Sequence, residues 1–256
     1  MRRPRSSESV LPHLGHPAVI ATGRAWRYKT PMTTAGSRLF ASLALWIDPE
    51  PRDGPAQMAC DEALLNLADW PVLRIFRWAR PWVSAGYFVP FAEAQAARPD
   101  LPVCRRWTGG GVVVHDGDFT FSLAAPRGEP WAAMRPADSY RVLHEALAAT
   151  LAQAGCRASL SEGQAAANRE CFAGPVRHDI VAGGRKIGGG AQRRTRRGLL
   201  HQGSIQGTPL ATGDAPLVAC GLAERLAPWM PPDILEREIT RLAREKYARH
   251  EFVRRA

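Results

Sequence analysis

The chain has 256 residues, of which 45% are hydrophobic and 23% are charged. This composition can bury a full core, as one large domain or one domain with a small appendage, and it argues against a largely disordered chain. No apolar run approaches the roughly 20 residues that a membrane-spanning helix needs. The five cysteines include no CxxC pair, which argues against a disulfide framework or a structural zinc site and favours a reducing cytoplasm.

The net charge of +10 is unevenly distributed along the chain. Residues 1–38 hold seven basic residues against one acid, hence six of the ten net positive charges. They show no hydrophobic periodicity and no apolar segment with a cleavage site, so they do not resemble a secretory signal. A transit peptide is compatible with this composition, and so is a true start at Met32. We predict a basic, disordered N-terminal extension over 1–38 and a folded domain over 39–256.

The first half of the folded domain is predicted to alternate short strands with one helix. Residues 42–50 indicate a strand, and a helix follows that begins after Asp53 and ends before Pro71. Segment 72–78 alternates apolar and basic side chains, which predicts a strand with one buried face. Short β-segments between Pro81 and Pro126 are separated by glycine and aspartate, so they favour antiparallel hairpins over parallel βαβ units.

The second half contains two predicted helices. Residues 137–155 carry leucines on one face, with Asp138 or Ser139 as N-cap and Gly155 at the end, and this pattern puts His144 at the solvent edge. A strand is expected over 198–206 and a helix over 232–247. The latter begins with a capping box of Asp233 and Glu236 and turns four residues to the core: Ile234, Leu235, Ile239 and Leu242. These separate blocks predict an α+β fold with a mixed, largely antiparallel sheet flanked by helices.

The segment RRWTGGGVVVHD, residues 105–116, is the first motif that could carry chemistry. Its three consecutive glycines permit positive φ and leave backbone N–H groups unshielded, so the loop can cradle an anion or an acyl oxygen. Two arginines add fixed positive charge, and His115 ends the next strand. A tight β-turn with a surface His-Asp pair explains the same residues, and the spacing is not that of a Walker loop.

The segment ECFAGPVRHDIVAGGRKIGGGAQRR, residues 170–194, places Cys171 ahead of a glycine-flanked lysine, Lys186. The pattern predicts two strands around a Gly183-Gly184 turn, followed by a second triglycine. Small neighbours let a large group approach Lys186 closely. Ordinary explanations also exist, namely a solvated hairpin lysine and a small core cysteine. The polar loop around Cys171 nevertheless favours an accessible thiol.

Three segments together resemble the lipoate–protein ligase and octanoyltransferase family, which shares its catalytic fold with biotin–protein ligases: RRWTGGGVVVHD, HDIVAGGRKIGGGAQRR and LLHQGSI. The segments GPAQMACDEALL and LRIFRWARPWVSAGYF fit the first helix and first hairpin of that family. The resemblance implies a biotin/lipoate protein ligase-type catalytic domain. It also implies transfer of an octanoyl or lipoyl group to one lysine of a lipoyl domain, such as the glycine cleavage H protein or a 2-oxoacid dehydrogenase subunit.

The spacing of Cys171 and Lys186 is similar to that of the cysteine-dependent octanoyltransferases, which take the acyl group from an acyl carrier protein onto a cysteine. The resemblance implies that Cys171 is the nucleophile, and that Lys186 favours its thiolate and polarises the acyl carbonyl. This route needs no cofactor, because a thioester keeps its acyl-transfer potential. The implied substrate site consists of Arg106, Thr108, Gly109, Gly110, Gly111, His115, Asp179, Gly188, Gly189 and Gly190.

Other hypotheses remain open at this point. Gly111 completes a triglycine that is more usual in ATP-dependent lipoate–protein ligases, which would use ATP and Mg²⁺, hold the adenylate phosphate in the 105–111 loop, and leave Cys171 incidental. Biotin transfer is a minor variant on the same fold. The charge and the run QRRTRRG at 192–198 raise nucleic-acid binding, but these residues form no recognised motif. We expect a cytoplasmic monomer without a metal site.

Overall fold

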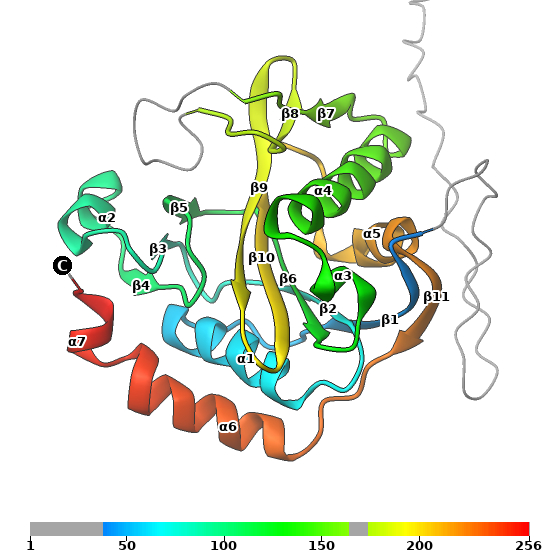
Figure 1. Ribbon diagram of the computed structural model, residues 1–256. Coiled ribbons are helices and arrows are strands. Elements are labelled where there is room, and N and C mark those ends of the chain that lie inside the picture. Colours follow the sequence, from blue (N-terminus) through cyan, green and yellow to red (C-terminus); the bar gives the residue numbers. More distant parts are fainter. Residues whose placement is uncertain (1–37, 164–173, 256) are drawn as a thin grey trace, which may run out of the picture.

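The computed structural model describes residues 38–163 and 174–255. Its largest element is a sheet that runs through the middle of the molecule (Figure 1). The spatial order of its eight strands is β11 (Ala223–Pro228), β1 (Phe40–Ile47), β2 (Val72–Phe76), β6 (Phe119–Pro126), β10 (Gly198–Ile205), β9 (Arg185–Arg194), β8 (Ile180–Ala182) and β7 (Ala158–Leu160). Strand β1 pairs in parallel with β11 and β2, and the remaining pairs are antiparallel. The predicted α+β class with a mixed, largely antiparallel sheet is confirmed.

Helices cover both faces of this sheet, so successive side chains of its central strands enter different cores. Leu73 and Leu123 pack into one core together with Leu143 and Leu147 of α4 (Pro136–Gln153). On the same side lie α3 (Pro130–Ala133), η1 (Thr212–Asp214) and α5 (Ala215–Leu222). The neighbouring residues Val72 and Ala124 face the opposite core, which α1 (Gly54–Leu67), α6 (Ile234–Leu242) and the π-helical turn η2 (Ala243–Tyr247) complete.

A small second sheet lies beside the first and carries the glycine loop. Its strand order is β4 (Val103–Arg105), β3 (Trp82–Ala85) and β5 (Val112–His115), with β3 parallel to β4 and antiparallel to β5. Helix α2 (Phe91–Ala97) packs against β3, and the last helix, α7 (His250–Val253), contacts β4. The predicted succession of simple hairpins is therefore wrong in this region, because β4 joins β3 in parallel and β6 leaves for the main sheet.

Several local predictions are wrong because tertiary contacts outweigh local patterns. Strand β2 is buried throughout, and Arg74 lies inside the protein rather than on a solvent face. His144 is fully buried on the inner face of α4, not at its solvent edge. Helix α6 has no side-chain cap from Asp233, and Ile234 is exposed. Neither Asp138 nor Ser139 caps α4, whose N-cap is Arg135.

Other predicted features match the structure. Asp53 caps α1 by accepting a hydrogen bond from the Ala56 N–H. Gly183 and Gly184 both have positive φ and form the predicted turn between β8 and β9. Within the described ranges, no helix has the length and apolar character that crossing a membrane requires. Residues 1–37 and the segment 164–173, which contains Cys171, lie outside the described residues.

Candidate active site

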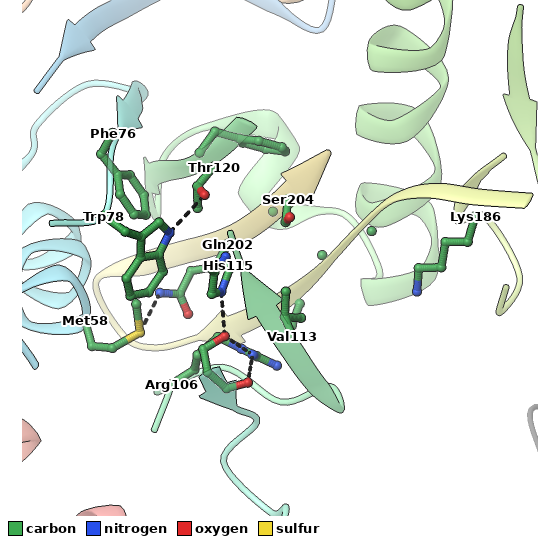
Figure 2. Close-up of a pocket in the computed structure, with 16 residues that line it drawn as sticks. Met58, Phe76, Trp78, Arg106, Val113, His115, Thr120, Lys186, Gln202 and Ser204 are labelled. Atoms are coloured by element: carbon green, nitrogen blue, oxygen red, sulfur yellow. Dashed lines mark hydrogen bonds between the residues drawn. The ribbon is translucent and has the colours of Figure 1, made fainter. Parts of the chain in front are cut away.

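A cavity of about 50 Å³, partly open to solvent, lies where the two sheets meet α1 (Figure 2). Its apolar wall comes from the side chains of Met58, Phe76, Trp78, Val113 and Phe121. Polar side chains gather on the rest of the wall: Ser84, Arg106, His115, Thr120, Lys186, Gln202 and Ser204. A largely apolar cleft with a few convergent polar groups is the usual form of a small-molecule site.

Lys186 reaches this cavity from β9 and is held by a buried ion pair. Its Nζ lies 2.7 Å from Oδ2 of Asp179, and the two side chains are only 5% and 1% exposed. The backbone N–H of Val176 donates to the same carboxylate oxygen at 2.8 Å, and Tyr140 donates its hydroxyl to Oδ1 at 2.7 Å. A buried side chain that is paired and hydrogen-bonded in this way is held in a defined position.

The glycines of β9 make room for this arrangement. A methyl group on Gly189 would lie 2.8 Å from Cε of Lys186 and 3.1 Å from Oδ1 of Asp179. A methyl group on Gly190 would lie 2.2 Å from Nε2 of His201. The N–H of Gly190 also donates to the Tyr140 hydroxyl at 3.1 Å, which links the strand to the Asp179 cluster. A side chain at either glycine would displace the groups that form the site.

The glycine loop between β4 and β5 is fixed mainly through its carbonyl oxygens. Arg106 donates from Nη2 to the carbonyls of Gly109 and Gly111, and from Nη1 to the carbonyl of Ser84 at 2.7 Å. The loop approaches the turn after β3 so closely that a methyl group on Gly86 would lie 2.0 Å from the Gly110 carbonyl oxygen. The neighbouring arginine, Arg105, turns away and donates to carbonyls near α2 and to Val253 of α7.

A chain of buried hydrogen bonds connects the loop to the core. Thr108 donates its hydroxyl to Oε1 of Gln202 at 2.7 Å, and the Gln202 amide donates to Oδ2 of Asp61 at 2.7 Å. Asp61 in turn accepts from Arg74, which also pairs with Asp48. Helix α1 and strands β2 and β10 therefore determine where the glycine loop sits.

A second polar chain crosses the wall of the cavity formed by the small sheet. Ser84 Oγ lies 2.7 Å from Nε2 of His115, and Nδ1 of the same imidazole lies 2.8 Å from Oδ2 of Asp118. Trp78 stacks on the His115 ring with centroids 4.2 Å apart and donates its indole N–H to Thr120. Figure 2 shows His115, Arg106 and Trp78 converging at one side of the cavity, with Lys186 across from them.

Comparison with known proteins identifies the family. The model of the lipoyl protein ligase A/B catalytic domain matches residues 53–208. This chain belongs to the lipoyl protein ligase A/B catalytic domain family. Two curated relatives are both named octanoyltransferase LipM: that of Moorella thermoacetica is 35% identical over 62% of this chain and 63% of its own length, and that of Carboxydothermus hydrogenoformans is 34% identical over 59% and 60%. The chain therefore spans less than two thirds of the length of these relatives.

Solved structures that superpose on this chain share its fold. A lipoate-protein ligase A bound with ATP superposes with a TM-score of 0.68 at 22% identity, covering 82% of this chain and 98% of that one. The bipartite lipoate protein ligase of Thermoplasma acidophilum superposes with a TM-score of 0.55 at 22% identity, over 84% and 96%. At 22% sequence identity, the similarity to these two structures shows a shared fold only.

The structure brings some of the predicted site residues of this family member together and separates others. Five of them line the cavity: Arg106, His115, Lys186, Gly189 and Gly190. Asp179 lies directly behind Lys186. Thr108 to Gly111 and Gly188 lie beside the cavity without lining it, and Cys171 lies outside the described residues.

Sequence reasoning missed several residues that the fold adds to the site. Asp118 is one of them, and the other four, Tyr140, Gln202, Ser84 and Trp78, belong to segments far from their partners in the chain, so no local pattern links those four. Only the family likeness of LLHQGSI pointed to the neighbourhood of Gln202. Spacing could have indicated the His115–Asp118 pair, which is three residues apart, although the adjacent Asp116 competes for that role.

The described cysteines do not have the environment of a nucleophilic thiol, which needs a low pKa and access to the cavity. Burial raises the pKa of the Cys60 and Cys104 thiols to about 12, so both are protonated at neutral pH. Burial also raises the pKa of Cys220. No cysteine of the described part of the chain lines the cavity. Within the same residues, no group of three or more His, Cys, Asp or Glu side chains is arranged to hold a metal ion.

Proposed function

We propose that this protein transfers an octanoyl or lipoyl group from an acyl carrier protein thioester, through a thioester on Cys171, to the acceptor lysine of a lipoyl domain. The acceptor class includes the glycine cleavage H protein and 2-oxoacid dehydrogenase subunits. The observation that carries the proposal is the buried Lys186–Asp179 ion pair at the wall of a largely apolar cavity. The relatives named octanoyltransferase support the same activity.

The described chain resumes at Gly174, three residues after Cys171, and contacts this ion pair soon afterwards. Val176 donates its backbone N–H to Asp179, which holds Lys186. The five residue-to-residue steps from Cys171 to Val176 can extend over at most ~18 Å. This reach is compatible with a thiol that meets an acyl group in the same cavity. The raised pKa values of Cys60 and Cys104 argue against either as a substitute.

The proposed reaction has two acyl-transfer steps. The Cys171 thiolate attacks the carbonyl of the carrier thioester, the carrier thiolate leaves, and the acyl group stays on the enzyme. The amine of the acceptor lysine then attacks this thioester, loses a proton, and releases the Cys171 thiolate as an amide forms. The Lys186 ammonium stabilises the oxyanion of each tetrahedral intermediate, and Asp179 keeps the ammonium in place. The apolar wall accommodates the hydrocarbon tail.

The ATP-dependent ligase is the second candidate, because a solved neighbour is a lipoate-protein ligase A bound with ATP. In that reaction the glycine loop and its arginines would hold the adenylate phosphate. Arg105 and Arg106 instead donate to backbone carbonyls around the loop, which favours a structural role for both. This engagement is why we favour the transferase, which requires neither ATP nor Mg²⁺.

Intact-mass analysis of an apo lipoyl domain distinguishes the two candidates. One reaction contains octanoyl–acyl carrier protein without ATP, and the other contains octanoate or lipoate with ATP and Mg²⁺. We expect a mass increase of one octanoyl group only in the first reaction, and its loss with Cys171→Ala. Product that requires ATP and survives Cys171→Ala would establish the ligase instead.

A matched cysteine variant controls for general effects of thiol removal. Cys156 is half-buried, lies outside the cavity wall and has a free thiol. Cys156→Ala should therefore transfer octanoyl at the wild-type rate. An equal loss in Cys156→Ala and Cys171→Ala would contradict the assignment of Cys171 as the nucleophile.

A further inference from the structure

Three buried side chains of the small-sheet wall have no part in the reaction described above. Ser84 lies on β3, His115 ends β5, and Asp118 follows in the turn before β6. The Ser84 hydroxyl oxygen is 2.7 Å from Nε2 of His115, and Nδ1 is 2.8 Å from Oδ2 of Asp118. Ser84 is fully buried as a residue, yet it contributes with His115 to the cavity wall.

The hydrogen bonds around Asp118 determine the direction of this chain. Burial alone would raise the pKa of Asp118, but His115, Ser204 and Thr120 together hold it below its ordinary value. The ionised carboxylate accepts, so Nδ1 of His115 carries a proton and donates. In the neutral imidazole, Nε2 is then the acceptor, and the Ser84 hydroxyl donates to it. This is the arrangement in which an imidazole can remove the proton of a serine hydroxyl.

Neighbouring side chains hold Ser84, His115 and Asp118 in their relative positions. Trp78 stacks against the His115 ring, and its indole N–H donates to Thr120, which itself donates to Asp118. Ser204 donates to the same Asp118 oxygen at 2.6 Å. On the other side, Nη1 of Arg106 donates to Ser84 Oγ at 2.6 Å, which places a fixed positive charge beside the hydroxyl.

We propose that Ser84, His115 and Asp118 form a second, serine-type acyl-transfer centre that hydrolyses medium-chain acyl esters and thioesters bound in the cavity. It shares the apolar wall with the proposed octanoyl transfer but does not depend on Cys171. A Ser-His-Asp constellation is identified by geometry and roles, and it recurs on unrelated folds. The substrate class follows from the wall, since Met58, Phe76 and Phe121 offer an apolar surface beside Ser84.

The reaction balances without a cofactor. Ser84 Oγ attacks the acyl carbonyl, its proton passes to Nε2 of His115, and the leaving thiolate or alkoxide takes that proton. An ester on Ser84 results. A water molecule then attacks the ester while His115 takes its proton and returns it to Ser84 Oγ, so the free acid leaves. Arg106 supplies positive charge beside the oxyanion that develops in each step.

The test measures hydrolysis of p-nitrophenyl octanoate and octanoyl-CoA by the full-length Cys171→Ala protein. We expect measurable turnover of both substrates in Cys171→Ala, and a decrease of at least ~100-fold when Ser84→Ala is added. Asp118→Asn should give a similar decrease, because the wrong imidazole tautomer is then stabilised. Ser159→Ala, at an exposed position on the edge strand β7, is the matched serine control and should retain the Cys171→Ala rate.

A labelling experiment identifies the nucleophile directly. A fluorophosphonate with an octyl chain should modify Cys171→Ala once, and the label should lie in the tryptic peptide 78–105, in which Ser84 is the only serine. Thermal unfolding shows that each variant is folded. A folded Cys171→Ala protein without turnover, an unchanged rate in the Ser84 variant, or a label in another peptide would each overturn the proposal.

The outcomes also separate this centre from the proposed octanoyl transfer. Acylation of the lipoyl domain by wild type without hydrolysis by Cys171→Ala would leave the transferase standing and remove the serine centre. Hydrolysis that requires Ser84, without acylation of the lipoyl domain by wild type, would support the serine centre and contradict the proposed octanoyl transfer.

Discussion

At the scale of single residues, the candidate site depends on the absence of side chains as much as on their presence. Lys186 folds back over Gly189, so the ammonium reaches Asp179 across a strand position that has no Cβ. This close approach explains why a glycine-rich strand is compatible with a buried ion pair. The motif around Lys186 predicted the need for space, although it could not predict which group would use that space.

Gly189→Ala should lower the rate of acyl transfer strongly while the protein stays folded. The added methyl group would lie 2.8 Å from Cε and 3.0 Å from Nζ of Lys186, so the end of the Lys186 side chain must shift from the position in which it pairs with Asp179. A displacement of about 1 Å at a reacting group can cost on the order of 100-fold in rate. The measurement is the initial rate of octanoyl transfer to an apo lipoyl domain.

Gly128→Ala is the matched control for this substitution. A methyl group on Gly128 meets nothing within 4 Å, and its φ is not in the left-handed region. We therefore expect an unchanged transfer rate in this variant. A wild-type rate in Gly189→Ala would show that Lys186 tolerates the shift, and would remove the argument for its fixed position.

The same scale shows which site residues sequence could predict. Lys186, Gly189 and Gly190 line the cavity and stand in recognisable local patterns, so the family likeness pointed to them. Tyr140 comes from the helix α4 and meets Asp179 only because that helix packs on the main sheet. Such contacts depend on tertiary structure, which no spacing in the chain encodes.

At the scale of elements, α1 and β2 are joined by charge rather than by apolar packing alone. Arg74 is fully buried between Asp48 and Asp61, with Nη2 2.6 Å from Asp48 and Nη1 2.8 Å from Asp61. The alternating sequence of β2 suggested a solvent face because arginine is usually exposed. One acidic partner, Asp48, directly follows β1 and the other, Asp61, lies on α1, so only the assembled fold could show that Arg74 is paired inside.

Asp61→Ala should destabilise the protein and disturb the glycine loop. The substitution removes one of the two carboxylates that balance the buried positive charge of Arg74. It also removes the acceptor of the Gln202 amide. Breaking a buried ion pair in this way costs roughly 3–5 kcal/mol in the free energy of unfolding. Urea denaturation of the purified protein measures that loss.

A surface ion pair provides the comparison for Asp61→Ala. Arg141 and Glu145 pair on the exposed side of α4, with side chains 39% and 49% exposed. Glu145→Ala should change the free energy of unfolding by less than about 1 kcal/mol. Equal losses in the two variants would argue that the buried network adds no stability of its own.

At the scale of the whole molecule, the fold class followed from the blocks of strands and helices, whereas the topology did not. The sequence predicted the α+β class and the positions of β1, α1, β10 and α4 within a few residues. It failed on the small sheet, because β4 and β5 pair with β3 instead of with each other. Strand order depends on which faces find partners in space, and short β-segments do not specify that choice.

Stability should fall as the pH decreases from about 6.5 to about 4. Burial lowers the pKa of His144 from 6.5 to about 4, and burial also lowers the pKa of His201 well below its usual value. The unfolded chain therefore binds more protons than the folded protein in this window, so acid favours unfolding. Each buried imidazole contributes up to about 1.4 kcal/mol per pH unit.

Urea denaturation at several pH values tests this dependence. His144→Gln should show a shallower loss of stability between pH 6.5 and pH 4 than wild type, because one of the two buried imidazoles is gone. His250→Gln, at an exposed position, should keep the wild-type slope. Equal slopes in wild type and His144→Gln would exclude His144 as a source of the acid sensitivity.

The predicted division of the chain into an N-terminal extension and a catalytic domain gives the last prediction. A protein that begins at Arg38 should unfold within about 2 °C of the full chain, a difference below ~1 kcal/mol. The described hydrophobic clusters begin at Leu39 and Phe40, and Arg38 itself donates to the Gly221 carbonyl.

The truncation removes half of the net charge of +10. Octanoyl transfer should persist, because the residues that line the cavity are all retained. Any salt-sensitive binding to RNA should weaken, because fewer positive charges remain. A large decrease in unfolding temperature would place residues before Arg38 in the folded domain, and RNA binding that remained strong would revive the nucleic-acid hypothesis.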